Sequence, residues 1–459
     1  MATFNRTTRI AAPAEFAFAW HERPGAFERL APPWEEMEVL EKKGTIRDGD
    51  ELMFRVKLGG LFWQRWHARH FGYIAGKQFC DEQLSGPFAS WKHVHRIESD
   101  GPDACVLHDE VEYHLPLEPL SNLTPRFLLE DKIEAMFNYR TAVTKRDIEH
   151  HFRTQGAPKR ILISGASGMV GTALTAFLQG GGHTVEPLLR RGAKARQNSH
   201  TWDPVKGFDA DALGRLEGID AVIHLAGENV FGVWTETKKK AIRESRVLGT
   251  RTLAEALAKL KNPPKVFIPA SAVGYYGETG DTAVDETGPM GSGFLAEVAR
   301  DWEAAAKPAI DAGIRTANMR IGVVMSAKGG ALAVMRTPFT VGVGGNVGNG
   351  RQWMSWVELE DVIGLFYHVL LTESVSGAVN TVAPFAVTNA ELTRTLGRVL
   401  GRPTFFPVPA FLVGALPGGM GEEIFLRSVR VVPKKALDTG YKFIFPDLEV
   451  AIRSSLGRL

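Results

Sequence analysis

The sequence predicts an antiparallel α+β domain followed by a doubly wound, parallel α/β domain. Before residue 153 the chain reads as successive strands closed by one long amphipathic segment, residues 125–152, which is typical of an antiparallel sheet packed on a helix. After residue 159, strand and helix patterns alternate, which predicts a parallel sheet with helices on both faces. The polar stretch TQGAP between the two regions marks a domain boundary.

Composition and charge exclude several classes of protein. Apolar residues make up 44% and charged residues 23% of the 459 residues, the balance of an ordinary globular protein. The net charge of +2 gives no electrostatic case for nucleic acid or membrane as a partner. No uninterrupted apolar run reaches the roughly 18 residues of a membrane span. Cys80 and Cys105 form no C-x-x-C motif. We therefore expect a cytoplasmic protein without nucleic-acid or membrane partners.

The expected elements follow from residue patterns of period 2 or 3.6. In the first domain the strands are FNRTTRI, EMEVLEK, ELMFRVKLG, WHARHFGYIAG, KQFCDEQL, WKHVHRIES and ACVLHDEVEYHL, with an early helix at AEFAFAWHE. In the second domain they are RILISG, TVEPLLR, DAVIHLAG, KVFIPASA and TANMRIGVVM. PTFFPVPAFLVGALPGG and the short helical pieces after it indicate a small appended subdomain. We expect domains at 1–152, 159–401 and 402–459.

A glycine-rich turn between a strand and a helix, ILISGASGMVGTALTAFL, is the clearest binding motif. Gly165 permits a tight turn, Gly168 lets the backbone approach a pyrophosphate, and Gly171 allows close packing of helix on strand. The helix N-terminus offers free N–H groups and a positive dipole end to phosphates. The turn therefore predicts a dinucleotide site. Its other candidate contacts are Ser167, Met169 and Val170.

The cofactor preference is expected at the end of the second strand, HTVEPLLRR. An NAD-binding chain would normally place Asp or Glu there to accept a hydrogen bond from the ribose 2′-OH. This chain has Arg190 and Arg191 instead, and a guanidinium can pair with a 2′-phosphate. The two arginines could also be simple solvated residues, but the missing carboxylate favours NADP over NAD.

With SGASGMVG, DAVIHLAGENV and ASAVGYYG, the chain resembles the extended, epimerase-like branch of the short-chain dehydrogenase/reductases. It is most similar to the atypical group described as epimerase family, or nucleoside-diphosphate-sugar epimerase of the cell-division-inhibitor type. The segments that carry this likeness are IRESRVLGTR, FLAEVARDWEAA, RIGVVMSAKGGAL, PFTVGVGGNVGNGRQWMSWVELEDV and VPKKALDTGY. The resemblance implies a Rossmann fold and a small-molecule substrate, with a sugar nucleotide as one candidate.

The resemblance also implies roles for single residues. Leu225, Ala226 and Gly227 would line the adenosine side of the cofactor, and Arg246 would reach toward it from the following helix. Gly322 and Val323 would lie near the nicotinamide. Ser271 matches the catalytic serine of the extended enzymes, Tyr275 the aromatic residue four positions later, and Arg351 the arginine that contacts a substrate diphosphate. Glu358 departs from the group, which usually has His there.

The helix GSGFLAEVARDWEAA lies where related enzymes carry Tyr-x-x-x-Lys. The two residues normally share one helix face, and the lysine lowers the pKa of the tyrosine, which transfers the proton. Here Phe294, Val298 and Trp302 form that face, and none of them can transfer a proton.

Three interpretations remain open. The first is an NADP-dependent oxidoreductase or epimerase with another acid or base, such as Tyr275, Tyr276, Ser271 or Glu297. The second is a protein that senses NADP(H) without turnover. The third treats the cofactor as a structural ligand that supports an interaction surface. We favour the first narrowly.

The Gly-rich loop 341–356 could be a flexible connection, but its length favours a lid over the substrate. Asp361 is expected to be the N-cap of the helix DVIGLFYHVLL.

Residues 1–152 resemble the START-like, polyketide-cyclase or SRPBCC class, a helix-grip fold with an apolar ligand cavity. The resemblance rests on the strand order, the long last helix and phrases such as FERLAPPWEEMEVL and GPFASWKHVHRI. Trp91, His93 and His95 alternate and point to one face of a strand. A His-x-His pair can bind metal, but the sequence shows no third ligand, so we expect cavity lining or packing and no metal.

Overall fold

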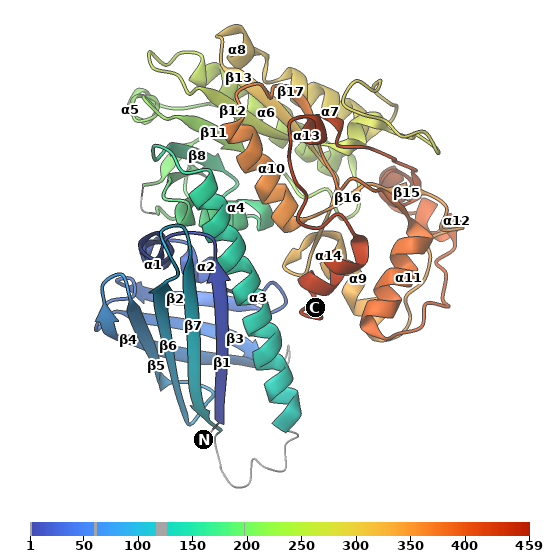
Figure 1. Cartoon of the computed structure of the whole chain (residues 1–459). Coiled ribbons are helices and arrows are strands. Elements are labelled where there is room, and N and C mark those ends of the chain that lie inside the picture. Colours follow the sequence, from blue (N-terminus) through green and yellow to red (C-terminus); the bar gives the residue numbers. More distant parts are fainter. Residues whose placement is uncertain (1, 59–61, 116–125, 197) are drawn as a thin grey trace. The chain divides into compact units, whose positions relative to one another are not determined.

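The chain folds into two compact units, one made mainly of residues 1–158 and the other mainly of residues 159–455 (Figure 1). The computed structural model describes residues 2–58, 62–115, 126–196 and 198–459. The boundary between the units falls just after the predicted polar stretch. Each unit has its own sheet and its own hydrophobic core.

The first unit is a seven-stranded antiparallel sheet with one long helix, as predicted. The order β1-β7-β6-β5-β4-β3-β2 is a meander from β2 to β7, with β1 added at the β7 edge. The strands are β1 (Ala2–Ile10), β2 (Met37–Lys43), β3 (Glu51–Leu58), β4 (Phe62–Ile74), β5 (Gln78–Ser85), β6 (Ser90–Ser99) and β7 (Cys105–His114). The helices are α1 (Ala14–Glu22), α2 (Ala26–Arg29) and α3 (Arg126–Arg153).

Helix α3 closes the first unit by packing apolar side chains on the inner face of its sheet. Ile133 and Phe137 of α3 lie against Trp91, Val111 and Tyr113 of the strands. A buried ion pair then joins α2 to α3. Arg29 Nε lies 2.6 Å from Asp147 Oδ2, and both side chains are almost fully buried. Apolar packing therefore fixes α3 on the sheet, and the buried ion pair fixes α3 to α2.

The second unit is built on a seven-stranded parallel sheet of order β10-β9-β8-β11-β12-β13-β17. Its strands are β8 (Arg160–Ser164), β9 (Thr184–Arg190), β10 (His200–Trp202), β11 (Ala221–His224), β12 (Val266–Ala272), β13 (Arg315–Ile321) and β17 (Gly377–Thr381). The order reverses between β8 and β11, so the crevice outside their carboxyl ends is the expected ligand position of this fold. This confirms the predicted doubly wound Rossmann sheet.

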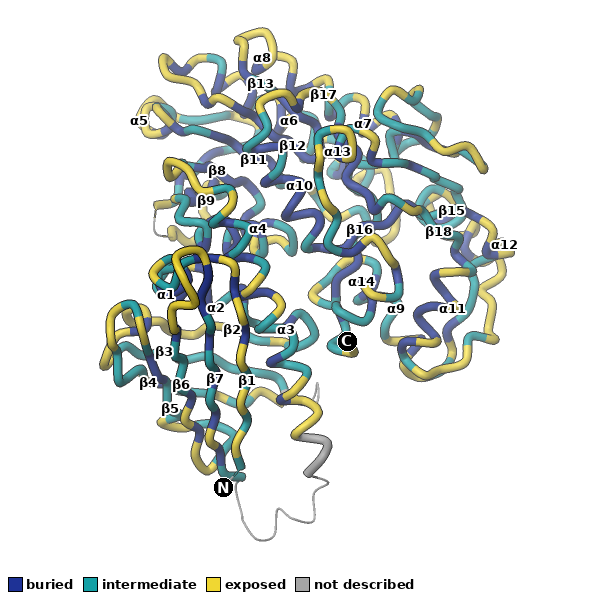
Figure 2. The backbone as a smooth tube through the Cα atoms, in the orientation of Figure 1, coloured by how far each residue is buried: buried dark blue, intermediate teal, exposed yellow. Residues whose placement is uncertain are grey.

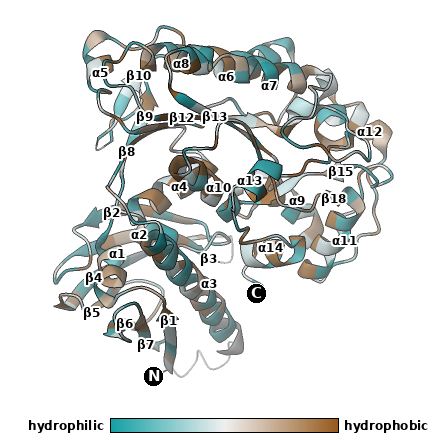
Figure 3. Cartoon of the chain, turned by 45° about the horizontal axis from the view of Figure 1, so that its top comes forward, coloured by the Kyte–Doolittle hydropathy of each residue, from teal (hydrophilic) through white to brown (hydrophobic). Residues whose placement is uncertain are grey.

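Helices cover both faces of the parallel sheet (Figure 3). One face carries α6 (Glu236–Leu257), α7 (Phe294–Ala304) and α8 (Lys307–Asp311), and the other carries α4 (Met169–Gly180) and α10 (Leu359–Leu371). The central strands are therefore buried over almost their whole length (Figure 2). None of the helices in the described part of the chain is long and apolar enough to cross a membrane.

The predicted strand TANMRIGVVM is two strands with different partners. β13 ends at Ile321 and pairs with β12 and β17, whereas β14 (Val323–Ser326) pairs with β16 (Trp356–Glu358). The change happens at Gly322, where an added Cβ would lie 2.5 Å from Ser355 O. The chain can turn away from the main sheet here because glycine lets the two backbones approach so closely.

Residues 402–455 belong to the same compact unit as the parallel sheet. They contain α12 (Ala410–Gly414), the turn η3 (Pro417–Gly419), the π-helical turn η4 (Glu422–Leu426), α13 (Lys434–Asp438) and α14 (Leu448–Ser455). The preceding part supplies α9 (Gly330–Thr340), β15 (Trp353–Met354), β18 (Val387–Thr388) and α11 (Asn389–Leu400), with α5 (Ala210–Gly214) and the 3₁₀ turn η2 (Val273–Tyr276) earlier in the unit.

Asp361 is a buried acceptor rather than the predicted N-cap of α10. The N-cap is Glu358, whose side chain accepts from the Glu360 N–H. Asp361 is in the first turn, and its carboxylate accepts from Tyr441 Oη at 2.9 Å and from the Ile444 and Phe445 N–H groups, both at 2.8 Å. The prediction was wrong because the spacing of the sequence does not show that residues 441–445 return to this helix.

We expect Asp361→Ala to lower the free energy of unfolding of the second unit by about 3 kcal/mol, because three donors lose a charged acceptor. Tyr441→Phe removes only one of these hydrogen bonds and should cost about 1 kcal/mol. Urea denaturation followed by tryptophan fluorescence measures both. Equal losses in the two variants would show that Asp361 does not fasten residues 441–445.

Candidate functional site

The glycine-rich turn lies at the carboxyl end of β8 and has the geometry of a phosphate-binding turn. Gly165 has φ +73°, and an added Cβ would lie 2.8 Å from Ala226 N on the neighbouring segment. At Gly171 an added Cβ would lie 2.2 Å from Gly165 O, so glycine is needed for the helix to pack on the turn. Ser167 and Gly168 are exposed, and Met169 and Val170 begin α4 beside them. The helix N-terminus is therefore open to an anion.

The segment after β11 runs next to this turn. Leu225 N–H donates to Ser164 O at 3.1 Å, and Ala226 N–H to Ser164 Oγ at 3.3 Å. From α6, Arg246 Nη1 donates to Glu228 O at 2.9 Å, and its guanidinium lies 3.3 Å from where a Cβ at Gly227 would be. Burial lowers the pKa of Arg246 to about 10. The structure thus brings Arg246 to the segment that the resemblance assigns to adenosine.

The end of β9 carries exposed positive charge. Arg191 lies 3.5 Å from Asp209 in an ion pair between exposed side chains. Arg190 is exposed and has no ion pair or hydrogen bond from its side chain within the described residues. The pKa of Glu228 is lowered mainly by Lys238 and in part by Arg190. Arg190 is therefore free to meet an anionic ligand.

The helix α7 shows the apolar face that the sequence predicts. Val298 and Trp302 are 2% and 6% exposed, and Phe294 packs beside Val298 against Trp234 and Ile242. Trp302 donates from Nε1 to Thr250 Oγ1 at 2.8 Å. Glu297, another candidate for proton transfer, is exposed and bonded to Arg243 of α6. None of these side chains offers a proton to the carboxyl edge of the sheet.

A buried polar network occupies the place where the catalytic groups were expected. Ser271 Oγ donates to Glu303 Oε1 at 2.7 Å, and Arg320 holds the same carboxylate with two hydrogen bonds of 2.8 Å. Arg320 also donates to Tyr276 Oη, which in turn donates to Asn380 Oδ1 at 2.7 Å. Burial raises the pKa of Tyr276 to about 12. The hydroxyl groups of Ser271 and Tyr276 therefore both donate hydrogen bonds within this buried network.

Tyr275 differs from its neighbour because its hydroxyl has no protein partner among the described residues. Its ring lies over the Arg320 guanidinium, with 3.5 Å between the guanidinium carbon and the ring centroid. The residue is half-buried and belongs to η2, directly after β12. Since β8, β11, β12 and β13 are parallel neighbours, the turns that follow them share one edge of the sheet.

The segments after β13 complete this edge. Val323 N–H donates to Ser355 O at 2.8 Å, which fixes the backbone that the resemblance places near the nicotinamide. Further on, Gly329 and Gly330 pack against Met169, the first residue of α4. The SAKGG segment therefore lies against the beginning of the glycine-rich helix.

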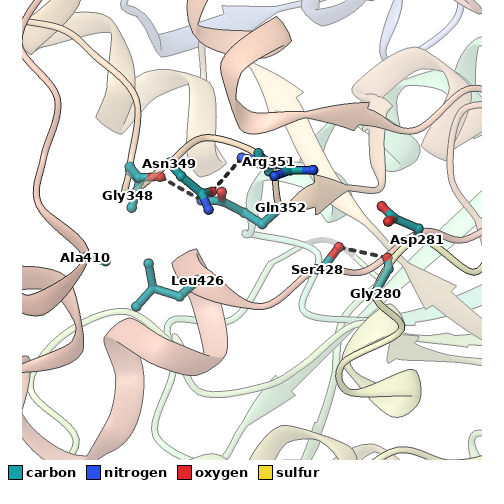
Figure 4. A pocket seen from close by; sticks show the side chains of 10 residues that line it. Gly280, Asp281, Gly348, Asn349, Arg351, Gln352, Ala410, Leu426 and Ser428 are labelled. Carbon is teal, nitrogen blue, oxygen red and sulfur yellow. Dashed lines mark hydrogen bonds between the residues drawn. The ribbon is translucent and has the colours of Figure 1, made fainter.

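Arg351 lines a pocket of about 380 Å³ (Figure 4). The loop 341–356 is tied down rather than free, because Gly348 N–H donates to Val408 O and Gln352 Nε2 donates to Phe425 O. Asp281 also lines this pocket and accepts from Trp353 Nε1 at 2.8 Å. The remaining lining residues are Gly280, Val347, Gly348, Asn349, Gln352, Ala410, Leu426 and Ser428.

Glu358, the residue that departs from the group, is a buried carboxyl with a structural role. It accepts from Ser455 Oγ at 3.0 Å and from the Glu360 N–H. Burial, with the nearby charge of Glu360, raises its pKa to about 8. It therefore connects α10 to α14.

The sequence reasoning missed Glu303, Arg320 and Asn380. The signal was present for Arg320, which is a charged residue inside the apolar strand pattern TANMRIGVVM. A charge in such a position needs a buried partner. Nothing in the sequence identified Glu303 as that partner, because it is on a helix that is otherwise amphipathic.

Comparison with known proteins agrees with this architecture. The NAD dependent epimerase/dehydratase family matches residues 161–382, and the family described as polyketide cyclase / dehydrase and lipid transport matches residues 10–138. A family described as a domain of unknown function matches residues 408–455.

This chain matches several relatives and solved structures over most of the length of those proteins. An epimerase family protein of Mycobacterium leprae is 40% identical over 285 residues, which are 62% of this chain and 91% of the relative. A nucleoside-diphosphate sugar epimerase from Corynebacterium glutamicum has a TM-score of 0.81 at 34% identity, covering 99% of this chain and 90% of that one. The human epimerase family protein SDR39U1, solved with NADPH, has a TM-score of 0.59 at 35% identity, covering 65% of this chain and 100% of that one.

With a Rossmann sheet, a glycine-rich turn and relatives matched along nine-tenths of their length, the chain belongs to the epimerase family of atypical extended short-chain dehydrogenases, and it carries a polyketide-cyclase-like N-terminal domain.

Proposed function

We propose that the chain binds NADP(H) at the carboxyl edge of the parallel sheet and acts as an oxidoreductase or nucleotide-sugar epimerase. The proposal rests on the exposed glycine-rich turn together with Arg190 at the end of β9. Arg190 has no protein partner among the described residues, and it stands where a carboxylate would select NAD. The human relative solved with NADPH supports the same cofactor. When bound, NADP(H) supplies or accepts a hydride.

Different residues at this edge would bind different parts of NADP(H). The α4 N-terminus, with Gly165, Ser167 and Gly168, meets the pyrophosphate, and Met169 and Val170 bound it on the helix side. Leu225, Ala226 and Gly227 lie along the adenosine, with Arg246 behind them. Val323 supplies backbone near the nicotinamide, and Arg190 pairs with the 2′-phosphate.

Tyr275 is our proposed proton donor. Ser271 and Tyr276 already donate to Glu303 and Asn380, so a transfer from either would break a buried network. The Tyr275 hydroxyl is free of such a bond, and its ring is held by Arg320. Ser271 then acts as a positioning residue through Glu303 and Arg320 rather than as the direct donor.

The pocket beside Arg351 supports a substrate with a diphosphate. A guanidinium can bind such a group with two hydrogen bonds, and the surrounding loop keeps Arg351 at the pocket. This substrate class also fits the Corynebacterium relative, which is described as a nucleoside-diphosphate sugar epimerase. The role of the loop as a lid stays a prediction, as do the cytoplasmic location and an apolar ligand in the first unit.

The second candidate function is NADP(H) sensing without turnover. It is favoured by the apolar face of α7 and by the engagement of Ser271 and Tyr276 in structural bonds. The two functions share the cofactor site and differ only in chemistry. Turnover therefore distinguishes them.

NADPH should bind more tightly than NADH, and Arg190→Ala should weaken NADPH about ten-fold or more while leaving NADH unchanged. The reason is the loss of a charge-assisted hydrogen bond to the 2′-phosphate. Titration of cofactor fluorescence measures both affinities. Arg215→Ala, which removes an exposed arginine elsewhere in the unit, is the control. Equal affinity for the two cofactors in the unmodified chain would contradict the role of Arg190.

Tyr275→Phe should lower turnover by about 10²-fold or more with the NADPH affinity unchanged, because only the proton-transferring hydroxyl is removed. The assay follows cofactor oxidation and epimer formation with panels of carbonyl compounds and sugar nucleotides. Val273→Ala, a change in the same 3₁₀ turn that leaves the hydroxyl in place, is the control. Tight NADPH binding with no turnover on either panel would favour the sensor instead.

A further inference from the structure

The inner face of the first unit's sheet carries a buried cluster of histidine and aspartate side chains. Asp81 of β5 is opposite His93 of β6, and His95 of β6 is opposite Asp109 of β7. His93 and His95 are two residues apart on one strand, so both point to the same face. The antiparallel register thus supplies the carboxylates that the sequence alone did not connect with the His-x-His pair.

We propose that Asp81, His93 and His95 bind one divalent transition-metal ion. A ligand atom from each residue lies within 4.8 Å of the other two. Asp81 Oδ2 is 3.5 Å from His93 Nδ1 and 3.6 Å from His95 Nε2. These distances are long for hydrogen bonds. They are close to the ~3.4 Å between two ligand atoms that are each about 2.1 Å from a tetrahedral ion.

The second aspartate occupies the position of an outer-shell partner. Asp109 Oδ1 lies 3.2 Å from His93 Nε2 and 2.7 Å from His95 Nδ1, the second contact being short but poorly aligned for a hydrogen bond. Each imidazole therefore has one nitrogen toward Asp81 and the other toward Asp109. Histidines that bind metal commonly donate their second N–H to a carboxylate, which fixes the ring and its tautomer.

Aromatic neighbours hold the two rings in these orientations. Phe79 stacks on His95 with 4.2 Å between centroids, and Phe137 of α3 meets His93 edge-on at 5.4 Å. Asp81 and Asp109 together balance the charge of a divalent ion. Arg140 of α3 interacts electrostatically with both carboxylates. Its positive charge lowers the affinity of the site for a cation, relative to the same site without Arg140.

The donor set selects the class of ion. Two imidazoles and one carboxylate suit zinc or iron(II), whereas calcium and magnesium prefer oxygen ligands. Three protein ligands leave a position for water or a bound molecule, as in catalytic rather than closed structural sites. The Asp81 side chain is 21% exposed and that of His95 12%, so the cluster is not sealed from solvent. We therefore infer a zinc or iron(II) site with an open coordination position.

A proton is the competing occupant of His95. Burial opposes its charge, but Asp109 and Asp81 outweigh burial and raise the pKa of His95 to about 9. The cluster without an ion is then an ion-pair network. If the cluster binds metal, the protein retains a divalent ion; if the cluster is only an ion-pair network, the protein does not.

The experiment uses the full chain without a histidine tag, freed of metal with a chelator and titrated with Co²⁺ and then Zn²⁺. We expect one Co²⁺ per chain, the visible d–d bands of a four- or five-coordinate site, no sulfur-to-cobalt charge transfer from Cys80 or Cys105, and displacement by Zn²⁺. Failure to retain either ion would overturn the proposal and leave the ion-pair network. This measurement on the unmodified chain does not depend on whether any variant folds.

Variants then test the ligand set. Asp81→Asn and His93→Ala should lower the Co²⁺ affinity at least about 100-fold, and Asp109→Asn by about 10- to 100-fold as an outer-shell change. His108→Ala is the matched control, because His108 is adjacent to Asp109 on β7 and faces the other side of the sheet. Circular dichroism confirms folding. Unchanged affinity in Asp81→Asn, or an equal loss in His108→Ala, would contradict the assignment.

Discussion

The paired charges of Glu303 and Arg320 are the interaction on which the candidate active site depends. Both side chains are largely buried, and a buried ion pair is stable only if its remaining hydrogen-bonding groups are satisfied. Ser271 and Tyr276 supply those bonds, and Tyr275 covers the guanidinium with its ring. The pair therefore fixes the hydroxyl groups that follow β12 and leaves one of them, on Tyr275, free of protein partners.

The same pair connects α7 to β13 of the parallel sheet. Phe294, Val298 and Trp302 form an apolar face of α7 that packs toward α6. Glu303 is one residue beyond Trp302, which on a helix turns its side chain by about 100°. Glu303 therefore lies on a neighbouring face of α7, where it accepts hydrogen bonds from Arg320 of the sheet.

Carboxyl groups connect the C-terminal residues of the second unit to the rest of that unit. Glu423 accepts from the Phe294 and Leu295 N–H groups at the start of α7, where a negative charge is favourable. Asp361 accepts from the Ile444 and Phe445 N–H groups, and the buried carboxyl of Glu358 accepts from Ser455 Oγ. The pocket beside Arg351 is lined by residues from the segments 280–281, 347–352 and 426–428 and by Ala410, so its shape depends on contacts between segments that are far apart in the sequence.

The sequence by itself determined the elements and the kind of fold. Strand alternation, helical periodicity and the glycine-rich turn are local patterns, and each depends on residues only a few positions apart. They were enough to predict both sheets, the long helix α3, the turn at Gly165 and the apolar face of α7. Strand β10 has only three residues, and β17 (GAVNT) lacks a run of apolar residues. The break at Gly322 is hidden inside the largely apolar segment MRIGVVM.

The tertiary structure alone decided which polar groups meet. Glu303 and Arg320, Asp361 and Tyr441, and Asp81 with His93 and His95 are joined by register and packing. Hydrogen bonds and ion contacts act over about 3 Å, so they depend on how the strands are aligned and not on the spacing of the residues along the chain. For this reason the sequence identified the histidine pair but not its carboxylates, and the catalytic candidates but not the network that holds them.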